Sequence, residues 1–452
     1  MNVHACTLTL LLIGMLTLAF NIQPAKASGT IYIRADGSVE PDTAPISSVD
    51  NVTYTFSGNI YDGIVVERDN IVVDGAGYTV QGSGGGAGIR IRTDGSNITV
   101  KNVEIKAFMT GISFSETSDI SIINNSVTSN LVGISTKYNF GGTVINNNNI
   151  TSNEGYGIHM RLCNSFTITN NNISSNGWDG IFSFVGNRDN VIANNIVSFN
   201  GYDESWGYHS GMSFKYGIYD SVIANNTIFN NNWYGFWGVE RNNIVTNNVI
   251  FNNWIGMMLS WNDNTITNNL ISNNEVGIEV RYHEQPNIIY HNNFINNIAQ
   301  VRIEWSPTKD TWDEGYPSGG NYWSDYEERY PGAMELDDSG IWDTPYEIDD
   351  YNQDNYPLME PYSPIPRTIG ELKTEIEELG LQGDIDNQGI VKSLIAKLNL
   401  AQKLVDKGKI DEAKSILEED FIPQVHNLTD IHITSEAAEI LIESAEYIMS
   451  HL

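Results

Sequence analysis

The sequence predicts a mainly β protein, a parallel β-helix solenoid followed by a small all-α bundle. The first observation is an Asn-Asn pair that recurs about every 21 to 24 residues, with one interval of about 31. The second is a Gly followed by an apolar residue, roughly ten residues after most pairs. The third is a change to apolar residues at three- and four-residue steps beyond residue 367. Repeats of this length are typical of solenoids, and the last pattern indicates helices.

The pairs and the glycines hold equivalent places in each repeat. The pairs end the segments 122–125, 144–149, 168–172, 191–195, 222–226, 244–248, 266–269 and 291–293. The glycines are Gly133, Gly157, Gly180, Gly235, Gly256 and Gly277. Ile and Val alternate with Ser, Thr and Asn, which indicates short strands and excludes the Leu spacing of leucine-rich repeats. Coils stack about 4.8 Å apart, so buried turn asparagines are expected to bond to neighbouring coils.

The first 27 residues read as a secretory signal peptide. Residues 7–20 form an apolar run, and Ala25-Lys26-Ala27 follows as a small-residue cleavage site. The run is short for a membrane span, and no later stretch is apolar enough to cross a bilayer. We therefore expect a secreted, extracellular or cell-surface protein without a transmembrane segment. Cys163, the one cysteine outside the signal, is expected to be a buried structural thiol.

The formal net charge is −32. Such a charge argues for solubility and against nucleic acid as a partner. Residues 28–300 are expected to form the β-helix with its N-terminal cap, and the acidic, aromatic residues 301–363 its C-terminal cap. Residues 364–452 are expected to form the helical bundle, in which Gly408 stops one helix and Ser435 caps the last.

Two closing motifs carry a family resemblance. Gly320-Asn321-Tyr322-Trp323-Ser324-Asp325-Tyr326 and Asp354-Asn355-Tyr356-Pro357-Leu358-Met359 resemble the NosD-like right-handed β-helix proteins, within the carbohydrate-binding and sugar-hydrolase β-helices of pectin lyase-like fold. The tail, with Ile390-Val391-Lys392-Ser393-Leu394, resembles the FIMAH domain of secreted proteins. The resemblance implies an exported, surface-associated protein. NosD proteins are linked to copper-site maturation, but this sequence shows no His or Met cluster with ligand spacing.

Alignment of the repeats on the Gly places aromatic residues in columns. Two residues before the Gly are Leu131, Gly155, Trp178, His209, Trp233, Trp254 and Glu275, and two residues after it are His159, Phe182, Ser213, Trp237, Met258 and Glu279. Rows of exposed rings stack on sugars, so Trp178, Phe182, Trp206, His209, Trp233, Trp237 and Trp254 are candidate polysaccharide-binding residues. The alternative is that these rings pack on one another and only shield the coil edges.

Basic residues gather in a third column, four residues after the Gly. It contains Ser115, Lys137, Arg161, Phe184, Lys215, Val239, Ser260 and Arg281. Cations beside aromatic rings suit an anionic glycan, and a Lys or Arg there could act as the base of a β-elimination. The long repeat interval adds Asp203 and Glu204 near the rings. The catalytic candidates are His159, Arg161, Asp203, Glu204, Lys215, Glu279 and Arg281, although no established catalytic signature is present.

One turn has the composition of a cation site. Asp337, Asp338 and Asp343 place carboxylate oxygens around Gly340, as a hard cation such as calcium requires. The spacing differs from that of an EF-hand, and solvated acidic turns are common.

Three functions stay open from the sequence. The first is a secreted or cell-surface β-helix protein that binds polysaccharide through the aromatic and basic strip, with a helical tail that contacts another surface protein. The second is a polysaccharide lyase, epimerase or glycoside hydrolase that acts on an anionic glycan. The third is a structural envelope spacer. The fold hosts all of these, so only the site can decide.

Overall fold

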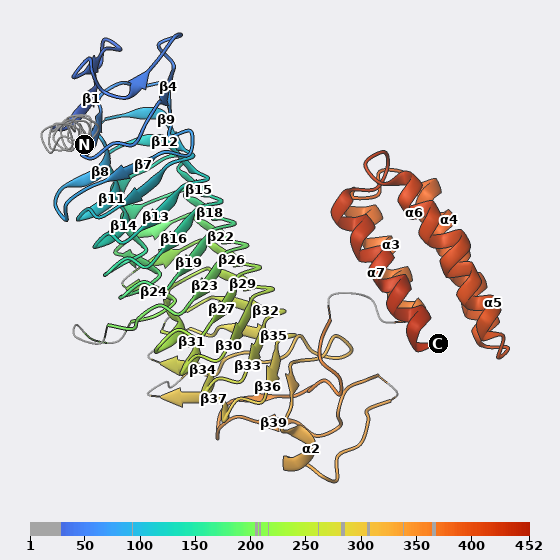
Figure 1. Cartoon of the computed structure of the whole chain (residues 1–452). Helices are drawn as coiled ribbons and strands as arrows, with labels where there is room; N and C mark the ends of the chain where they lie inside the picture. Colours follow the sequence, from blue (N-terminus) through green and yellow to red (C-terminus); the bar gives the residue numbers. More distant parts are fainter. Residues whose placement is uncertain are drawn as a thin grey trace, which may run out of the picture. The chain divides into compact units, whose positions relative to one another are not determined.

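The computed structural model describes residues 29–92, 94–203, 207, 209–215, 217–260, 262–281, 285–304, 308–337, 339–363 and 368–452. The signal-peptide expectation for residues 1–27 lies outside them. The chain divides into two compact units between Pro361 and Tyr362. The first is a parallel solenoid of stacked coils, and the second is helical (Figure 1). The predicted fold class, a right-handed parallel β-helix followed by an all-α bundle, is confirmed.

Three sheets, here called A, B and C, run along the solenoid, which makes about 11 turns between residues 53 and 304. Sheet A contains, in order, β2 (Val39–Glu40), β1 (Ile31–Ile33), β5 (Ile64–Val66), β8 (Ala87–Ile91), β11 (Thr110–Ser115), β14 (Val132–Asn139), β17 (Ile158–Cys163), β20 (Ile181–Phe184), β24 (Met212–Lys215), β28 (Tyr234–Val239), β31 (Ile255–Leu259), β34 (Val276–Arg281) and β37 (Ala299–Glu304). Sheet B contains β3 (Ile46–Ser47), β4 (Thr53–Phe56), β6 (Ile71–Asp74), β9 (Ser96–Lys101), β12 (Ser118–Ile123), β15 (Val144–Asn146), β18 (Thr167–Thr169), β22 (Val191–Ala193), β26 (Val222–Ala224), β29 (Ile244–Thr246), β32 (Thr265–Thr267) and β35 (Ile288–Tyr290). Sheet C contains β7 (Thr79–Gln81), β10 (Glu104–Lys106), β13 (Ser126–Thr128), β16 (Asn149–Thr151), β19 (Asn172–Ser174), β23 (Ile196–Ser198), β27 (Thr227–Phe229), β30 (Val249–Phe251), β33 (Leu270–Ser272), β36 (Asn293–Ile295) and β38 (Tyr322–Trp323).

Alternation along each short strand fills the interior with Ile and Val. In sheet B the column Ile145, Ile168 and Ile192 is buried, while the residues on either side of it face outward or lie in turns. Cys163 is likewise buried and free, as the sequence predicts. Burial raises the pKa of its thiol, which suits packing better than nucleophilic chemistry.

The repeated Gly marks the entry into each strand of sheet A. A Cβ at Gly157 would lie 2.5 Å from the carbonyl oxygen of Gly180 in the next coil and 2.9 Å from Nδ2 of Asn176. Only a residue without a side chain fits such an approach. The Gly therefore recurs because each coil packs its backbone against the next at this point.

Buried asparagines form ladders along the axis, and the two longest lie in the B-to-C and C-to-A turns. In the B-to-C turns the backbone N–H and Nδ2 of each Asn donate to Oδ1 of the Asn in the next coil, and Nδ2 also donates to a carbonyl of the preceding coil. This ladder contains Asn125, Asn148, Asn171, Asn195, Asn226, Asn248, Asn269, Asn292 and Asn321. The ladder in the C-to-A turns contains Asn130, Asn153, Asn176, Asn200, Asn231, Asn253, Asn274 and Asn297. The predicted bonding between coils is confirmed.

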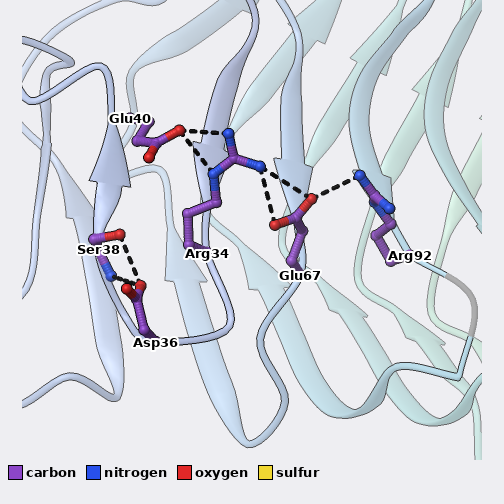
Figure 2. A network of polar contacts seen from close by, with 6 residues as sticks. All are labelled: Arg34, Asp36, Ser38, Glu40, Glu67 and Arg92. Carbon is purple, nitrogen blue, oxygen red and sulfur yellow. Dashed lines mark hydrogen bonds and ion pairs between the residues drawn. The ribbon is translucent and has the colours of Figure 1, made fainter.

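The N-terminal end is closed by antiparallel pairs, β1 with β2 and β3 with β4. On its surface Arg34 bridges Glu40 and Glu67, and Arg92 binds Glu67 with N and O atoms 2.7 Å apart (Figure 2). This network joins the cap hairpin to the first coils. Since Glu40 and Arg92 are exposed and Arg34 and Glu67 are only partly buried, the network contributes little to the free energy of unfolding.

The C-terminal end is closed by an aromatic cap with α2 (Tyr326–Arg329), β39 (Tyr346–Glu347) and β40 (Gln353–Asp354). Trp323 stacks on Phe294 of the last coil on one side and on Tyr346 on the other, with ring centroids 4.4 Å and 4.1 Å away. Asp354 lies beside Trp323 and is fully buried. It accepts hydrogen bonds from the Asn321 N–H, Trp323 Nε1 and the Tyr356 N–H.

The second unit contains α3 (Ile369–Gln382), α4 (Gln388–Val405), α5 (Ile410–Ser415), the π-helical turn Ile416–Phe421, α6 (Ile422–Leu428) and α7 (Ser435–His451). Leu394, Leu398, Leu417 and Leu441 lie in its own apolar core. The expectation that Ser435 caps the last helix is wrong. Thr434 has the extended backbone of an N-cap and accepts from the Ala437 N–H, so the helix starts one residue earlier than a cap at Ser435 would require. No helix in the described residues is long and apolar enough to cross a membrane.

Candidate functional site

The outer face of sheet A carries the aromatic columns that the repeat alignment predicted. His159 pairs with Phe182, Phe182 with Ser213, Ser213 with Trp237, Trp237 with Met258 and Met258 with Glu279 in consecutive strands. These side chains therefore form one column along the solenoid axis. We call the outer face of β17, β20, β24, β28 and β31, with the turns that precede these strands, the strip.

Rings touch one another in the first half of the strip. Tyr156 stacks on Phe182 with centroids 4.6 Å apart and meets the edge of Trp178 at 4.8 Å. Trp178 in turn stacks on His209, with centroids 5.9 Å apart. Burial, and then the nearby Arg161 cation, lower the pKa of His159 and so favour the neutral imidazole.

A second group of rings occupies β28 and β31. Trp233 and Trp254 meet edge to face with centroids 4.2 Å apart and ring planes 72° apart, and Tyr234 stacks on Trp237 at 6.0 Å. Trp233 and Trp237 pack beside the buried residues Tyr234, Ile255, Met258 and Val276. Trp254 is 40% exposed, so among these rings it offers an open face. Trp206, another predicted ring, lies outside the described residues.

Cations follow one edge of the strip. Lys137 pairs with Arg161 in the adjacent strand, Arg161 with Phe184, and Phe184 with Lys215. The Lys215 ammonium lies 5.9 Å from the centre of the Trp237 ring, and Lys137 and Arg161 are exposed. An open depression of 680 Å³ at the same edge is lined by Tyr138, whose ring lies 5.9 Å from Lys137 Nζ and from Arg161 Cζ.

The expected place of Val239 in this column is wrong. Gly238, with φ 83°, makes a bulge, so Val239 pairs with Leu259 and is buried in the core. The bulge brings Glu240 to the position that follows the strand. Burial raises the pKa of Glu240 to about 7, which a hydrogen bond from Tyr219 and the charge of Arg241 offset only in part. Bulges often redirect side chains in this way beside functional sites.

A buried Asp–His pair lies at the opposite edge. His209 Nδ1 is 3.1 Å from Asp179 Oδ2, and the Ser210 N–H donates to Asp179 Oδ1 at 2.7 Å. Both side chains are buried, and burial raises the pKa of Asp179. The carboxylate fixes the orientation of the imidazole and leaves Nε2 directed elsewhere.

Four buried polar atoms of this pair and its neighbours have no hydrogen-bond partner among the described residues. They are Trp178 Nε1, His209 Nε2, Ser210 Oγ and Ser213 Oγ, from two consecutive coils. Each unpaired buried group costs about 1–3 kcal/mol of stability.

Two candidate catalytic residues belong to an ion-pair network at the end of sheet A. Glu279 is fully buried and pairs with both Arg281 and Arg302. Arg281 also lies 3.1 Å from Glu304. The network neutralises Glu279 and Arg281, so neither is available there as an unpaired acid or base.

The remaining candidates are dispersed. The Asp203 N–H bonds to the Gly177 carbonyl at 2.9 Å, which fastens the start of the long insertion, whereas Glu204 lies outside the described residues. Asp337 and Asp343 are exposed, and Asp343 accepts from the Met334 N–H at 3.0 Å. Asp338 lies outside the described residues. Across the described residues, no three His, Cys, Asp or Glu side chains are arranged to hold a metal ion.

Sequence reasoning missed Tyr156, Asp179, Ser210 and Tyr234, which stand one residue before the repeated Gly. Strict alternation would turn this position inward. The Gly and the apolar residue after it both face the core, because a Cβ at Gly157 would meet Asn176 and Ile173. The preceding residue therefore faces outward. Aligning that column would have shown its aromatic and polar character.

Three family models match the chain. The model described as periplasmic copper-binding protein (NosD) matches residues 195–328, and the model of the right-handed β-helix region matches residues 46–197 and 111–254. The FIMAH domain model matches residues 369–450. No curated protein matches the sequence.

Several solved structures match part of the chain at low sequence identity. The Dettilon tailspike protein is 18% identical with a TM-score of 0.42, and the match covers 60% of this chain and 58% of the tailspike. The A-module of the mannuronan C-5 epimerase AlgE4 of Azotobacter vinelandii is 16% identical, with a TM-score of 0.39 over 63% of this chain and 89% of the module. The alginate lyase of a Paenibacillus species is 12% identical, with a TM-score of 0.37 over 55% and 89%. The chain forms a right-handed parallel β-helix, part of which matches the NosD model, followed by a helical unit that matches the FIMAH domain model.

Proposed function

We propose that this protein binds polysaccharide outside the cytoplasm through the strip on sheet A. The observation that supports it is the register of His159, Phe182 and Trp237, with the open ring of Trp254 beside them. Coils repeat about every 4.8 Å, so these three rings lie along one line, with Ser213 between Phe182 and Trp237. A linear polymer can lie on such a line and meet one coil after another.

The edges of the strip favour an acidic polymer over a neutral one. Lys137 and Arg161 are exposed in adjacent strands, in a chain of formal charge −32. Cations next to rings can neutralise uronate carboxylates while the sugar faces stack on the rings. The apolar run at residues 7–20 supports export, and the helical unit is proposed to attach the protein to a surface partner.

The test is retention of the whole mature chain on immobilised polygalacturonate, on its methyl ester and on a neutral β-glucan. We expect tightest binding to polygalacturonate and a loss of that binding in Trp254→Ala. Equal retention of wild type and Trp254→Ala would contradict the proposal. Absence of binding to all three polymers would favour the structural-spacer alternative.

Catalysis on an anionic glycan is the second candidate, and Glu240 favours it. A carboxyl group with a pKa of about 7 can transfer a proton at neutral pH. It follows the Gly238 bulge at the end of the strand that carries Trp237. Lyase activity would produce unsaturated uronides, measured by absorbance after incubation with polygalacturonate. Product formed by wild type and not by Glu240→Gln would support this candidate.

A further inference from the structure

We infer that an open depression beside Phe199 and Tyr202 is a second glycan site, which binds an uncharged sugar. It lies in the C-to-A turns, which precede the strands of sheet A, whereas Lys137 and Arg161 lie near the ends of their strands. Its described lining residues are Ser175, Phe199, Asn200, Tyr202, Asn230 and Asn232. None of them is a ring or a cation to which binding of the acidic polymer is assigned, so the inference goes beyond the proposed function.

Phe199 occupies a turn position that other coils give to small polar residues. It precedes the ladder residue Asn200 and has the left-handed conformation, with φ 56°. The equivalent residues, each left-handed and one before a ladder asparagine, are Ser129, Ser152, Ser175, Asn230, Asn252, Asn273 and Asn296. A bulky side chain is costly in this conformation, whereas Asn tolerates it. The geometry of the turn therefore does not explain an aromatic ring at Phe199.

Packing explains only part of this ring. Its edge meets Phe229 with centroids 5.6 Å apart, and Phe229 stacks on Phe251 at 4.9 Å. Phe199 is nevertheless 52% exposed, and Tyr202 is 60% exposed. Large parts of both rings thus bury no apolar area on folding and contribute nothing there to the hydrophobic stabilisation. The two exposed rings line the same depression.

Backbone bonds on both sides of Tyr202 hold it at the start of the long insertion. The Gly201 N–H donates to the Asn176 and Trp178 carbonyls at 3.0 Å and 2.9 Å. The Asp203 N–H donates to the Gly177 carbonyl at 2.9 Å. The Tyr202 backbone is therefore ordered before any ligand arrives, which reduces the entropy that binding costs.

The chemistry of the lining fits a neutral sugar. The depression has a volume of 370 Å³, within the range of about 300–1,000 Å³ for small-molecule sites. It extends over the consecutive turns of Ser175, Phe199 and Asn230, about 10 Å along the axis. Rings can stack on the C–H faces of a sugar, while amide and hydroxyl groups donate to and accept from its hydroxyls. None of the described lining residues is charged, so an acidic or basic sugar finds no opposite charge among them.

The experiment is isothermal titration calorimetry of the whole mature chain with cellohexaose, mannohexaose and galactohexaose, and with polygalacturonate. Phe199→Asn removes the ring and supplies a residue that the same turn position accepts at Asn230. We expect neutral-sugar binding to weaken about tenfold or more. The thermal midpoint should stay unchanged or rise, because Asn tolerates the left-handed backbone better than Phe does. Tyr202→Ala should weaken the same binding about fivefold to tenfold. Both variants should bind polygalacturonate as wild type does.

Asn252→Ser is the matched control, since Asn252 holds the same turn position outside the depression, and it should change neither affinity nor midpoint. If wild type binds none of the neutral hexasaccharides, or Phe199→Asn binds them as wild type does, the inference is wrong. An equal loss of polygalacturonate binding in Phe199→Asn would assign this ring to the acidic polymer and overturn the neutral class. If neutral-sugar binding depends on Phe199 while wild type does not bind polygalacturonate, the proposed function fails and this inference stands.

Discussion

Two sets of buried polar side chains lie in the same coils and differ in one respect. The ladder asparagines make their hydrogen bonds within the protein, and Asn171 alone has five side-chain bonds to its neighbours. The cluster of Trp178, His209, Ser210 and Ser213 leaves one polar atom unpaired on each residue. The serines and His209 are about as buried as the ladder asparagines, so the two sets differ in whether their polar atoms have hydrogen-bond partners.

The largest expected effect tests the ladder bonds by removal of one asparagine. Asn171→Ala should lower the free energy of unfolding by about 3–5 kcal/mol, because it leaves several buried donors and acceptors of two adjacent coils without partners. The measurement is urea-induced unfolding followed by circular dichroism. Asn172→Ala is the control, because Asn172 is exposed and its Nδ2 makes a single side-chain bond, to Asn149. Similar losses in the two variants would show that the ladder contributes no special stability.

Asp354 tests whether a satisfied buried group can still oppose folding. Burial raises its pKa from 3.8 to about 7, despite three N–H donors. The folded protein thus binds the Asp354 proton more tightly than the unfolded chain does. The stability that this proton contributes is complete below pH 3.8 and is lost as pH rises to about 7. Relative to Asp354→Asn, the free energy of unfolding of wild type should fall by about 3–4 kcal/mol across this pH range. Thermal midpoints of both proteins at pH 4 to 8 provide the test. Parallel slopes would contradict it.

The fold could be predicted because every coil repeats the same requirements. Asn bonding in the turns and the close approach at Gly157 recur with one period, so the sequence shows them many times. The start of α7 occurs once, and the choice between Thr434 and Ser435 depends on backbone geometry that no repeat reveals.

The site was predicted in part for the same reason. The column of His159, Phe182 and Trp237 follows from the repeat alignment. Glu240 could not be placed, because the bulge at Gly238 breaks the register in one coil only. The Asp179–His209 pair was missed since it crosses the long interval, where residues 30 apart become neighbours.

Trp254 tests whether an exposed ring of the strip contributes to binding more than to stability. It is 40% exposed and contacts Trp233 edge to face, so Trp254→Ala should weaken polygalacturonate binding more than tenfold. The loss of stability should be smaller than for Trp233→Ala, because Trp233 packs on the buried cluster around Tyr234. Affinity chromatography and thermal unfolding measure the two effects. Tyr351→Ala, an exposed ring in the C-terminal cap, is the control and should change neither.

The cationic edge should have a smaller, salt-dependent effect. Arg161→Ala should weaken binding of polygalacturonate about fivefold at low ionic strength and leave binding of its methyl ester unchanged. At 1 M salt the screening length is about 3 Å, so the difference between wild type and variant should largely vanish. Titrations at both ionic strengths measure this. Lys392→Ala, an exposed cation in the helical unit, controls for net charge.

The smallest expected effect concerns calcium at the acidic turn. Its side chains Asp337 and Asp343 are exposed, so they belong to neither set of buried polar groups. Asp337 is exposed in the left-handed conformation, with φ 53°, and Asp343 already accepts from Met334 and Thr344. A site so open binds weakly, at Kd near the millimolar range of extracellular modules. Calcium at 5 mM, roughly five times such a Kd, would then stabilise the cap by about 1 kcal/mol and raise the thermal midpoint by about 1–3 °C. Magnesium at the same concentration controls for ionic strength, and Asp337→Asn, which tolerates the same backbone, should abolish the shift. A rise that magnesium reproduces, or that persists in Asp337→Asn, would mean screening of the negative charge and no calcium site.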